Sequence, residues 1–489
     1  MLEKYFNSFR SNTIGIDQLF ETPYGIKKIV YADWTASGRL YAPIEKQLMQ
    51  IIGPFVGNTH TETTVTGSGM TQAYHTALQI IKRHVNALPS DVIISSNSGM
   101  TGVVNKFQRI LGLRIHEKYR DQIQIKEEDK PVVLVTHMEH HSNQTSWLET
   151  IADLVIIPSN DAGLVDLKGL EELLEKFKNR KTKIAAVTSY SNVTGIATPY
   201  YQIAEIMHRV GGVCFVDFAC AAPYINIDMH PEKLEQQLDA VYFSPHKFLG
   251  GPGSTGILIF DSKLYTNKIP DCPGGGTVEW TNPWGSHKYI DDIEKREDGG
   301  TPAFLPTMKV AMCIKLKEQM DVKKMLEREE ELMALVWPAL EKIPGLHILA
   351  GNIKDRLGIF SFYIDNLHYN LGVKILNDRF GIQMRGGCSC AGTYGHYLLQ
   401  VDIKQSSEIT ERISHGDLSC KPGWLRFSIH PIMTNDEVNF IMDAVKQLAI
   451  HHSEWRKEYE YNPATNDYIH KTESSSIMLG MVDRWFNFD

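Results

Sequence analysis

Short apolar segments alternate with amphipathic stretches along residues 26–305, and this alternation is the strongest constraint on the fold. The apolar segments predict strands at 91–95, 132–136, 154–157, 184–189, 213–217 and 240–243. The amphipathic stretches predict helices at 101–111, 167–177 and 200–210. Strands joined by helical crossovers run parallel and are covered on both faces, so we expect an α/β fold around a mostly parallel sheet. The segment 256–260 follows too closely for a crossover and should be an antiparallel neighbour.

Beyond this region the pattern is typical of a smaller α+β domain. Glycine and proline cluster at 272–276 and 298–302, before predicted helices at 307–320 and 326–337. The second helix should stop before Pro338, because a residue ahead of proline avoids the helical conformation. Later elements are predicted as strands near 347–350 and 359–364 and a helix at 435–451. We expect four parts: an N-terminal segment 1–25 packing on the small domain, a large domain 26–305, a small C-terminal domain 306–451 and an extension 452–489.

Composition and charge exclude several classes of protein. The 489 residues include 50 Lys and Arg against 58 Asp and Glu, and the net charge of −8 argues against a general nucleic-acid binder. No stretch has the ~20 apolar residues of a membrane span, and the N-terminus lacks the apolar core of a signal peptide. Seven cysteines in so long a chain do not form a disulfide framework. We therefore expect a cytoplasmic protein with no nucleic-acid or membrane partner.

Two charged residues follow strands that the pattern predicts to be buried. Asp217 ends the segment 213–217, at the edge where open α/β sheets bind ligands, and an ionised Asp there needs a cation such as a protonated ring nitrogen. Lys247 follows 240–243, and an amine shielded from water can form a Schiff base with an aldehyde. The alternatives are a helix-capping Asp217 and an exposed loop Lys247.

Polar residues after two further strands suggest how a flat, phosphorylated ligand is held. His140 and His141 follow 132–136, and because adjacent side chains point apart, at most one should stack on a ring or transfer a proton. The turn at 96–99 opens a helix whose free N–H groups can hold a phosphate. It matches no nucleotide fingerprint, which favours a small cofactor. A metal site is the competing hypothesis, but no metal-ligand spacing supports it and we predict none.

Two features near the C-terminal end complete the candidate site. The glycine-rich segment MRGGCSCAGTYG places Cys388 and Cys390 near Arg385, whose charge would favour a thiolate. The apolar segment WLRFSIH contains Arg426, whose planar fork can hold a carboxylate through two hydrogen bonds. The alternatives are two ordinary loop cysteines and a structural ion pair of Arg426 with a nearby carboxylate.

The order of these features resembles the class V aminotransferase superfamily of fold-type I pyridoxal 5'-phosphate (PLP) enzymes. Within it, the sequence is most similar to cysteine desulfurases and selenocysteine lyases of group II, from about Tyr31 to Lys446. The most specific piece is VDFACAAPY followed by AVYFSPHKFLGGPGSTGILI. The resemblance implies a large domain with a seven-stranded, mostly parallel sheet, a smaller α+β C-terminal domain, and a homodimer.

The resemblance also implies roles for single residues. Lys247 matches the lysine that carries PLP as a Schiff base, Asp217 the acid that keeps the pyridine nitrogen protonated, and His140 a catalytic histidine stacked on the ring. Asn192 matches an Asn near the phenolic oxygen and the substrate, and Arg426 the clamp on the substrate carboxylate. The implied phosphate ligands are Met100, Thr101, Ser244, His246 and, reaching a neighbouring subunit, Thr301.

The cysteine segment matches the family motif R-x-G-x-x-C-A, in which Cys390 is the nucleophile. The sequence departs from the family's pattern nearby, because Cys388-Ser389 replaces the common His-His. Cys220 stands where Gln is usual and is a much weaker hydrogen-bond partner. Met100 stands where Thr is usual, so only a backbone contact remains. The Cys-x-Cys pattern also resembles the desulfurase domain of molybdenum-cofactor sulfurases, so either cysteine could be the reactive thiol.

The implied activity is the conversion of L-cysteine to L-alanine, with a persulfide formed on the loop cysteine and passed to a possible acceptor protein. An alternative is a class V aminotransferase, epimerase or lyase that acts on another amino acid without sulfur transfer. A third hypothesis is a cofactor-free interaction module, but such a module has no physical need for Lys247 together with Asp217.

Overall fold

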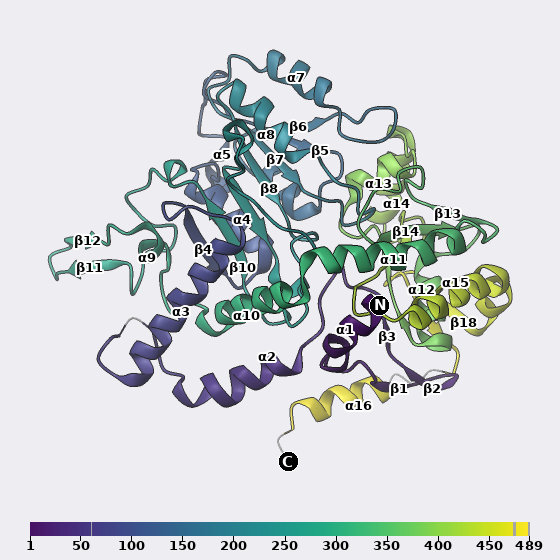
Figure 1. The fold of residues 1–489 in the computed structure, drawn as a ribbon. Coiled ribbons are helices and arrows are strands. Elements are labelled where there is room, and N and C mark those ends of the chain that lie inside the picture. The colour runs from purple at the N-terminus through teal and green to yellow at the C-terminus, as the bar shows by residue number, and fades with distance from the viewer. Residues whose placement is uncertain (60, 473–475, 488–489) are drawn as a thin grey trace.

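A seven-stranded sheet forms the centre of the computed structural model, which describes residues 1–59, 61–472 and 476–487. The strand order is β4-β10-β9-β8-β7-β5-β6 (Figure 1). The strands are β4 (Val92–Ser96), β5 (Val132–Thr136), β6 (Asp153–Ile157), β7 (Lys183–Thr188), β8 (Val213–Asp217), β9 (Ala240–Phe243) and β10 (Gly256–Phe260). The neighbours from β9 to β6 pair in parallel, whereas β10 is antiparallel to both β9 and β4. The predicted α/β fold, including the antiparallel strand, is confirmed.

Helices cover both faces of this sheet, because alternate residues of each strand point into different cores. In β8, Phe215 packs against Phe107 of α4 (Gly99–Ile110), with ring centroids 4.9 Å apart. Val216 of the same strand belongs to the opposite core, together with Met207 of α8 (Tyr200–Arg209). α7 (Leu167–Lys176) packs next to α8 and β6. These three helices lie within two residues of their predicted ranges.

The remaining helices of the first 320 residues were mostly outside the sequence-based expectations. They are α1 (Leu2–Ser11), α2 (Ala42–Lys46), α3 (Val65–His84), α5 (Glu117–Arg120), α6 (Thr145–Leu148), α9 (Ile293–Glu297) and α10 (Phe304–Met320), with a π-helix at Gln47–Ile52 and short 3₁₀ turns at Gly53–Phe55, His141–Asn143, Leu234–Gln236, Pro245–Lys247 and Ser262–Leu264. The long α3 packs along α10. Its buried positions Met70, Tyr74, Ala77 and Ile81 recur at helical spacing, which is the signal that would have identified it.

A second, antiparallel sheet lies beside the first, in the order β13-β14-β17-β16. Its strands are β13 (Leu346–Ile348), β14 (Ile359–Ile364), β16 (Arg385–Gly387) and β17 (Trp424–Ser428). The accompanying helices are α11 (Val322–Leu340), α12 (Tyr369–Phe380), α13 (Gly392–Leu398), α14 (Ile403–Ser414) and α15 (Asn435–Trp455). The prediction that the helix stops before Pro338 is wrong, because α11 contains it. Pro338 is exposed in the last turn, and burial of Trp337 and Leu340 on either side offsets the hydrogen bond that proline removes.

Short strand pairs complete the chain. They are β1 (Leu19–Thr22) with β2 (Gly25–Lys28), β3 (Val30–Tyr31) with β15 (Ile382–Gln383), β11 (Val278–Thr281) with β12 (His287–Tyr289), and β18 (Tyr459–Asn462) with β19 (Asp467–His470). The extension 452–489 therefore contains a hairpin and α16 (Ser476–Trp485), while its residues 473–475 and 488–489 lie outside the described residues. None of the helices within the described ranges is long and apolar enough to cross a bilayer.

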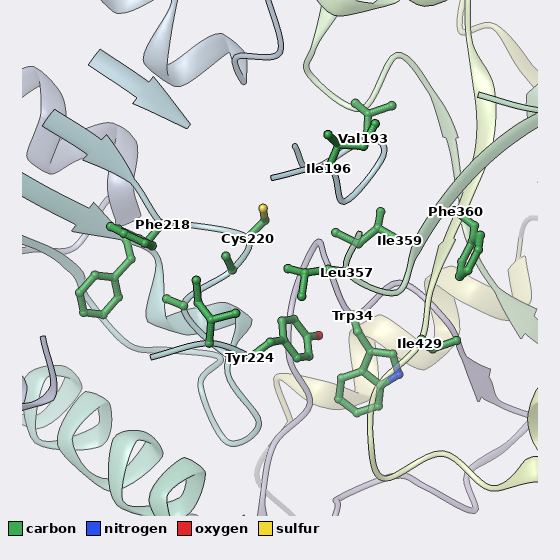
Figure 2. Close-up of a cluster of buried hydrophobic side chains, with 14 of the residues drawn as sticks. Trp34, Val193, Ile196, Phe218, Cys220, Tyr224, Leu357, Ile359, Phe360 and Ile429 are labelled. Atoms are coloured by element: carbon green, nitrogen blue, oxygen red, sulfur yellow. The ribbon is translucent and has the colours of Figure 1, made fainter. Parts of the chain in front are cut away.

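A buried apolar cluster joins the loops of the central sheet to the second sheet (Figure 2). Val193 and Ile196 come from the loop after β7, Ile359 begins β14, and Leu357 lies just before it. The Leu357 N–H donates to the carbonyl oxygen of Gly195 at 2.9 Å. Because β17 pairs with β14, this packing holds β17 against the loops that end the central strands.

Candidate active site

A cavity of about 200 Å³ lies where the carboxyl ends of the central strands meet the second sheet. Its lining includes these predicted site residues: Met100, Thr101, His140, Asn192, Asp217, Ser244, His246, Lys247, Cys390 and Arg426. Thr301 is exposed and does not line the cavity. Residues from seven separate parts of the chain therefore meet at one place, which the order of motifs suggested and the sheet topology explains.

Asp217 is the last residue of β8, and Lys247 lies in the turn after the adjacent parallel strand β9. Asp217 is 3% exposed, and burial raises the pKa of its carboxyl to about 6, even though Oδ1 accepts a hydrogen bond from the Ala219 N–H at 2.7 Å. Burial also lowers the pKa of the Lys247 amine. Within the described ranges, Lys247 Nζ makes no hydrogen bond or ion pair. The cavity thus holds an acid and an amine that both tend toward their neutral forms.

His140 and His141 point to different sides of the loop after β5. Burial, reinforced by the charge of Lys247, lowers the pKa of His140 to about 3, so its imidazole is neutral. Its Nδ1 accepts a hydrogen bond from the Ser142 N–H at 3.1 Å, which leaves the ring proton on Nε2. His141 donates its backbone N–H to the carbonyl oxygen of Cys390 at 2.7 Å, and its Nε2 accepts from the Gly392 N–H at 2.9 Å. His140 therefore faces the cavity, while His141 holds the cysteine loop.

The first turn of α4 forms a polar end of the cavity. The Met100 N–H donates to Ser244 Oγ at 2.9 Å, and the hydroxyls of Thr101 and Ser142 lie 2.6 Å apart. Burial lowers the pKa of His246 to about 4, so this imidazole is also neutral. A helix N-terminus flanked by hydroxyls is suited to bind an anion such as a phosphate.

Arg426 is 3% exposed and already has partners in the structure. Its Nη1 donates to the carbonyl oxygen of Asn192 at 2.9 Å, and its Nη2 contacts Asp33 Oδ1 at 2.8 Å. The other oxygen of Asp33 accepts from Arg385 Nε at 3.1 Å. The structural ion pair considered from the sequence is therefore present. Arg426 Nε is buried and has no hydrogen-bond partner in the described part of the chain, so this N–H remains for a ligand.

The cysteine loop brings one of its two thiols to the cavity. Cys390 is exposed and lines the cavity, whereas Cys388 is partly buried against the core. Ser389 and Cys390 have φ values of +52° and +55°, an uncommon left-handed conformation for residues other than glycine. Asn192 Nδ2 donates to the carbonyl oxygen of Ser389 at 2.8 Å and helps to hold this conformation.

Three of these positions were missed in the sequence. Asp33 follows β3, and an Asp after a short apolar segment was the available signal, but its contact with Arg426 spans 393 positions. In the sequence, His141 is only a second histidine beside His140, and Ser389 is only a departure from the family motif. Such contacts depend on loops from different sheets meeting, which local patterns do not encode.

A family profile and several known proteins match this chain over most of its length. The family profile described as "Aminotransferase class-V" matches residues 30–441. The chain belongs to the class-V aminotransferase family. A probable cysteine desulfurase of Halalkalibacterium halodurans is 27% identical over 368 residues, covering 74% of this chain and 84% of that protein. Another from Staphylococcus epidermidis is 28% identical over 379 residues, covering 76% and 86%.

The fold of this class-V aminotransferase is similar to the solved structures of two cysteine desulfurases. One, in its apo form, comes from Thermococcus onnurineus, with a TM-score of 0.72, 21% identity, and coverage of 91% of this chain and 98% of that one. The other comes from Escherichia coli, with a TM-score of 0.70, 22% identity and the same coverage. The expected fold type I is thereby confirmed.

The cavity fits the PLP cofactor that class-V aminotransferases use. Lys247 offers an amine for the aldehyde, and Asp217 offers a buried carboxyl for a cationic ring nitrogen, which would repay the cost of ionising it. The hydroxyls and N–H groups at the start of α4 suit the phosphate. The aldehyde, the ring nitrogen and the phosphate of the cofactor therefore each meet a residue of suitable chemistry in this cavity.

Proposed function

We propose that this class-V aminotransferase is a PLP-dependent cysteine desulfurase that converts L-cysteine to L-alanine and keeps the sulfur as a persulfide on Cys390. The observation that supports the proposal is the meeting of Lys247, Asp217, His140 and Cys390 around one cavity. The two relatives above are both described as probable cysteine desulfurases.

PLP, when bound, supplies an aldehyde that condenses with amines and a ring that withdraws electrons from the substrate Cα. Lys247 would hold the aldehyde carbon, and Asp217 would hold the proton of the ring nitrogen. The neutral His140 would lie against the ring. Met100, Thr101, Ser244 and His246 would surround the phosphate.

Lys247 and Cys390 would perform the chemical steps. Once displaced by the substrate's amine, Lys247 Nζ would take the Cα proton; its lowered pKa favours the free amine that this requires. The Cys390 thiolate would then attack the substrate sulfur. A sulfur–sulfur bond forms, the substrate's carbon–sulfur bond breaks, and its electron pair stays on the carbon skeleton, which becomes alanine after protonation.

Arg426 would hold the substrate carboxylate, with Asn192 beside it. Because Arg426 contacts Asp33 at 2.8 Å, an incoming carboxylate would use the unpaired Nε or displace Asp33 toward Arg385. Because Asp33 also contacts Arg385, its carboxylate would keep a cationic partner after the substrate displaces it from Arg426.

The decisive experiment is to incubate the PLP-loaded protein with L-cysteine and a reductant and to measure alanine and sulfide together. We expect equal amounts of the two products. Alanine and sulfide both at the level of a protein-free control would contradict the proposal.

A second candidate is a class V enzyme that acts on another amino acid without sulfur transfer. It is favoured by Cys220, whose thiol contacts the carbonyl oxygen of Tyr190 at 2.9 Å in place of the amide that the family usually has. Amino transfer to a keto acid, with no sulfide from cysteine, would support this candidate.

We also propose that the enzyme acts as a homodimer in the cytoplasm and passes sulfur to an acceptor protein. Met49, Ile51 and Phe55 are at least half exposed, and beside them an apolar cavity of about 610 Å³ lies between α2, α3 and α10. Such a face is suited to a second copy. Thr301 is exposed and does not line the cavity of its own chain, so it would be free to reach the phosphate site of the second copy. The seven cysteines are all free thiols, which suits a reducing compartment.

A further inference from the structure

The C-terminal extension contains a hairpin that contacts the elements behind the cysteine loop. The hairpin consists of β18 and β19, and it lies beyond residue 441, where the match to the family ends. Its turn residue Asn466 is only 6% exposed and has a φ of +58°. An asparagine buried at the tip of a terminal hairpin indicates that its side chain makes contacts with the rest of the fold.

Asn466 makes three hydrogen bonds. Its Nδ2 donates to the Tyr369 hydroxyl oxygen at 2.8 Å, and its Oδ1 accepts from the Tyr461 hydroxyl at 2.9 Å. Its carbonyl oxygen accepts from Asn370 Nδ2 at 2.6 Å. A buried polar group with its bonds satisfied in this way sets one geometry, because any displacement leaves a donor or acceptor unpaired.

Tyr369 and Asn370, at the start of α12, lie directly against the backbone of β16 and the residue before β17. A Cβ on Gly423 would stand 2.5 Å from a ring carbon of Tyr369, and one on Gly386 would stand 2.6 Å from Asn370 Oδ1. Only glycine allows this approach. β16 ends at Gly387, immediately before Cys388, so the two side chains support the base of the cysteine loop.

We propose that the hairpin is a brace for the cysteine loop, in which Asn466 acts as a positioning residue through Tyr369 and Asn370 and sets where Cys390 lies relative to the cavity. The inference rests on the proposed function only in giving Cys390 its chemical task. The path consists of hydrogen bonds of 2.6 and 2.8 Å followed by side-chain packing against glycine backbone.

The hairpin is also tied to the protein at points away from Asn466. The Tyr459 hydroxyl donates to Asp378 Oδ2 at 3.2 Å, and the Tyr24 hydroxyl contacts His470 Nε2 at 3.1 Å. A change at Asn466 should therefore loosen the brace without detaching the hairpin, which makes the proposal testable in the full chain.

The test compares three variants of the PLP-loaded enzyme with the parent. Asn466→Gly keeps a residue that accepts positive φ but removes the side-chain contacts. Tyr369→Phe keeps the ring packed on Gly423 and removes only the hydroxyl. Glu460→Gln is the matched control, because Glu460 is exposed on β18 of the same hairpin.

We expect Asn466→Gly and Tyr369→Phe to increase deuterium uptake in peptides covering 385–395 and to change the rate of Cys390 alkylation by iodoacetamide. Turnover of cysteine should fall by about 10-fold in kcat, with KM and the cofactor absorbance spectrum unchanged, because a displaced thiol impairs the chemical step alone. Glu460→Gln should match the parent in every measurement.

Unchanged deuterium uptake and alkylation in both variants would overturn the brace. If Asn466→Gly does not fold, the milder Tyr369→Phe decides the question. If the parent enzyme itself does not release alanine and sulfide, the proposed function is wrong. Deuterium uptake and alkylation do not require turnover, so they still test the brace.

Discussion

At the scale of single residues, burial moves three groups of the cavity toward neutrality. The pKa of Asp217 is raised to about 6, that of His140 is lowered to about 3, and that of Lys247 is lowered. Each shift reflects a charge that is costly to keep in a buried position and that a charged ligand can compensate. Functional groups of this kind reduce the stability of the protein that holds them.

Replacing Asp217 should reveal this cost. Its folded-state pKa of about 6 exceeds its ordinary value of 3.8, so the folded protein binds more protons between these values and loses stability as pH rises through about 6. We expect cofactor-free Asp217→Asn to be more stable than the parent by about 1–3 kcal/mol at pH 7.5 and by less at pH 5, measured by urea denaturation. A stability difference that does not depend on pH would contradict this explanation.

The two loop cysteines should differ sharply. Because Cys390 lines the cavity and Cys388 packs against the core, Cys390→Ala should lose nearly all alanine and sulfide release from L-cysteine. Cys388→Ala should retain most of it. Assaying the two PLP-loaded variants side by side checks this. The reverse pattern would identify Cys388 as the nucleophile.

At the scale of elements, the ends of helices connect distant parts of the chain. α15 begins with a capping box in which Thr434 and Glu437 bond each other's backbone N–H groups. The same Glu437 accepts two hydrogen bonds from Arg10 of α1, at 2.6 and 2.5 Å. One carboxylate thus stabilises a helix start and ties the N-terminal helix to it.

Replacing Glu437 should lower the free energy of unfolding by removing two contacts, the capping box and the ion pair with Arg10. Glu437→Ala loses both contacts, and we expect about 2 kcal/mol less free energy of unfolding. Glu437→Gln keeps the capping box and should lose less. Chemical denaturation of both variants measures the two contributions, and equal losses would show that the capping box contributes nothing.

At the scale of the whole molecule, three exposed apolar residues share the face formed by the π-helix Gln47–Ile52 and the turn Gly53–Phe55. Met49, Ile51 and Phe55 are 69%, 56% and 50% exposed, next to the apolar cavity between α2, α3 and α10. The division of the chain into 1–25, 26–305, 306–451 and 452–489 stays a prediction. Figure 1 shows the second sheet, in green shades, beside the blue and teal strands of the central sheet.

A charge on this face should separate the two copies. We expect the parent protein to sediment at twice the chain mass and Phe55→Glu to sediment as a monomer with an unchanged circular dichroism spectrum. A parent that is monomeric at micromolar concentration would contradict the proposed dimer. The monomer should also lose activity if Thr301 of the other copy is needed at the phosphate.

The sequence alone determined the central sheet and most of the candidate site. Val132–Thr136, Val213–Asp217 and Gly256–Phe260 occupy their predicted positions because buried strands require continuous apolar runs, which are local in the chain. The placement of Asp217 and Lys247 follows from the same rule, since Asp217 ends one such strand and Lys247 lies in the short turn after another.

Only the tertiary structure decided which partners those residues have. Pro338 lies inside α11, Arg426 contacts Asp33, and Asn466 contacts Tyr369, because packing between distant segments outweighs local preference. Cys388 and Cys390 have the same local chemistry, and the left-handed turn at Ser389–Cys390 determines which of them reaches the cavity. Local sequence sets where a strand or loop forms, whereas the contact between two loops depends on the whole chain that brings them together.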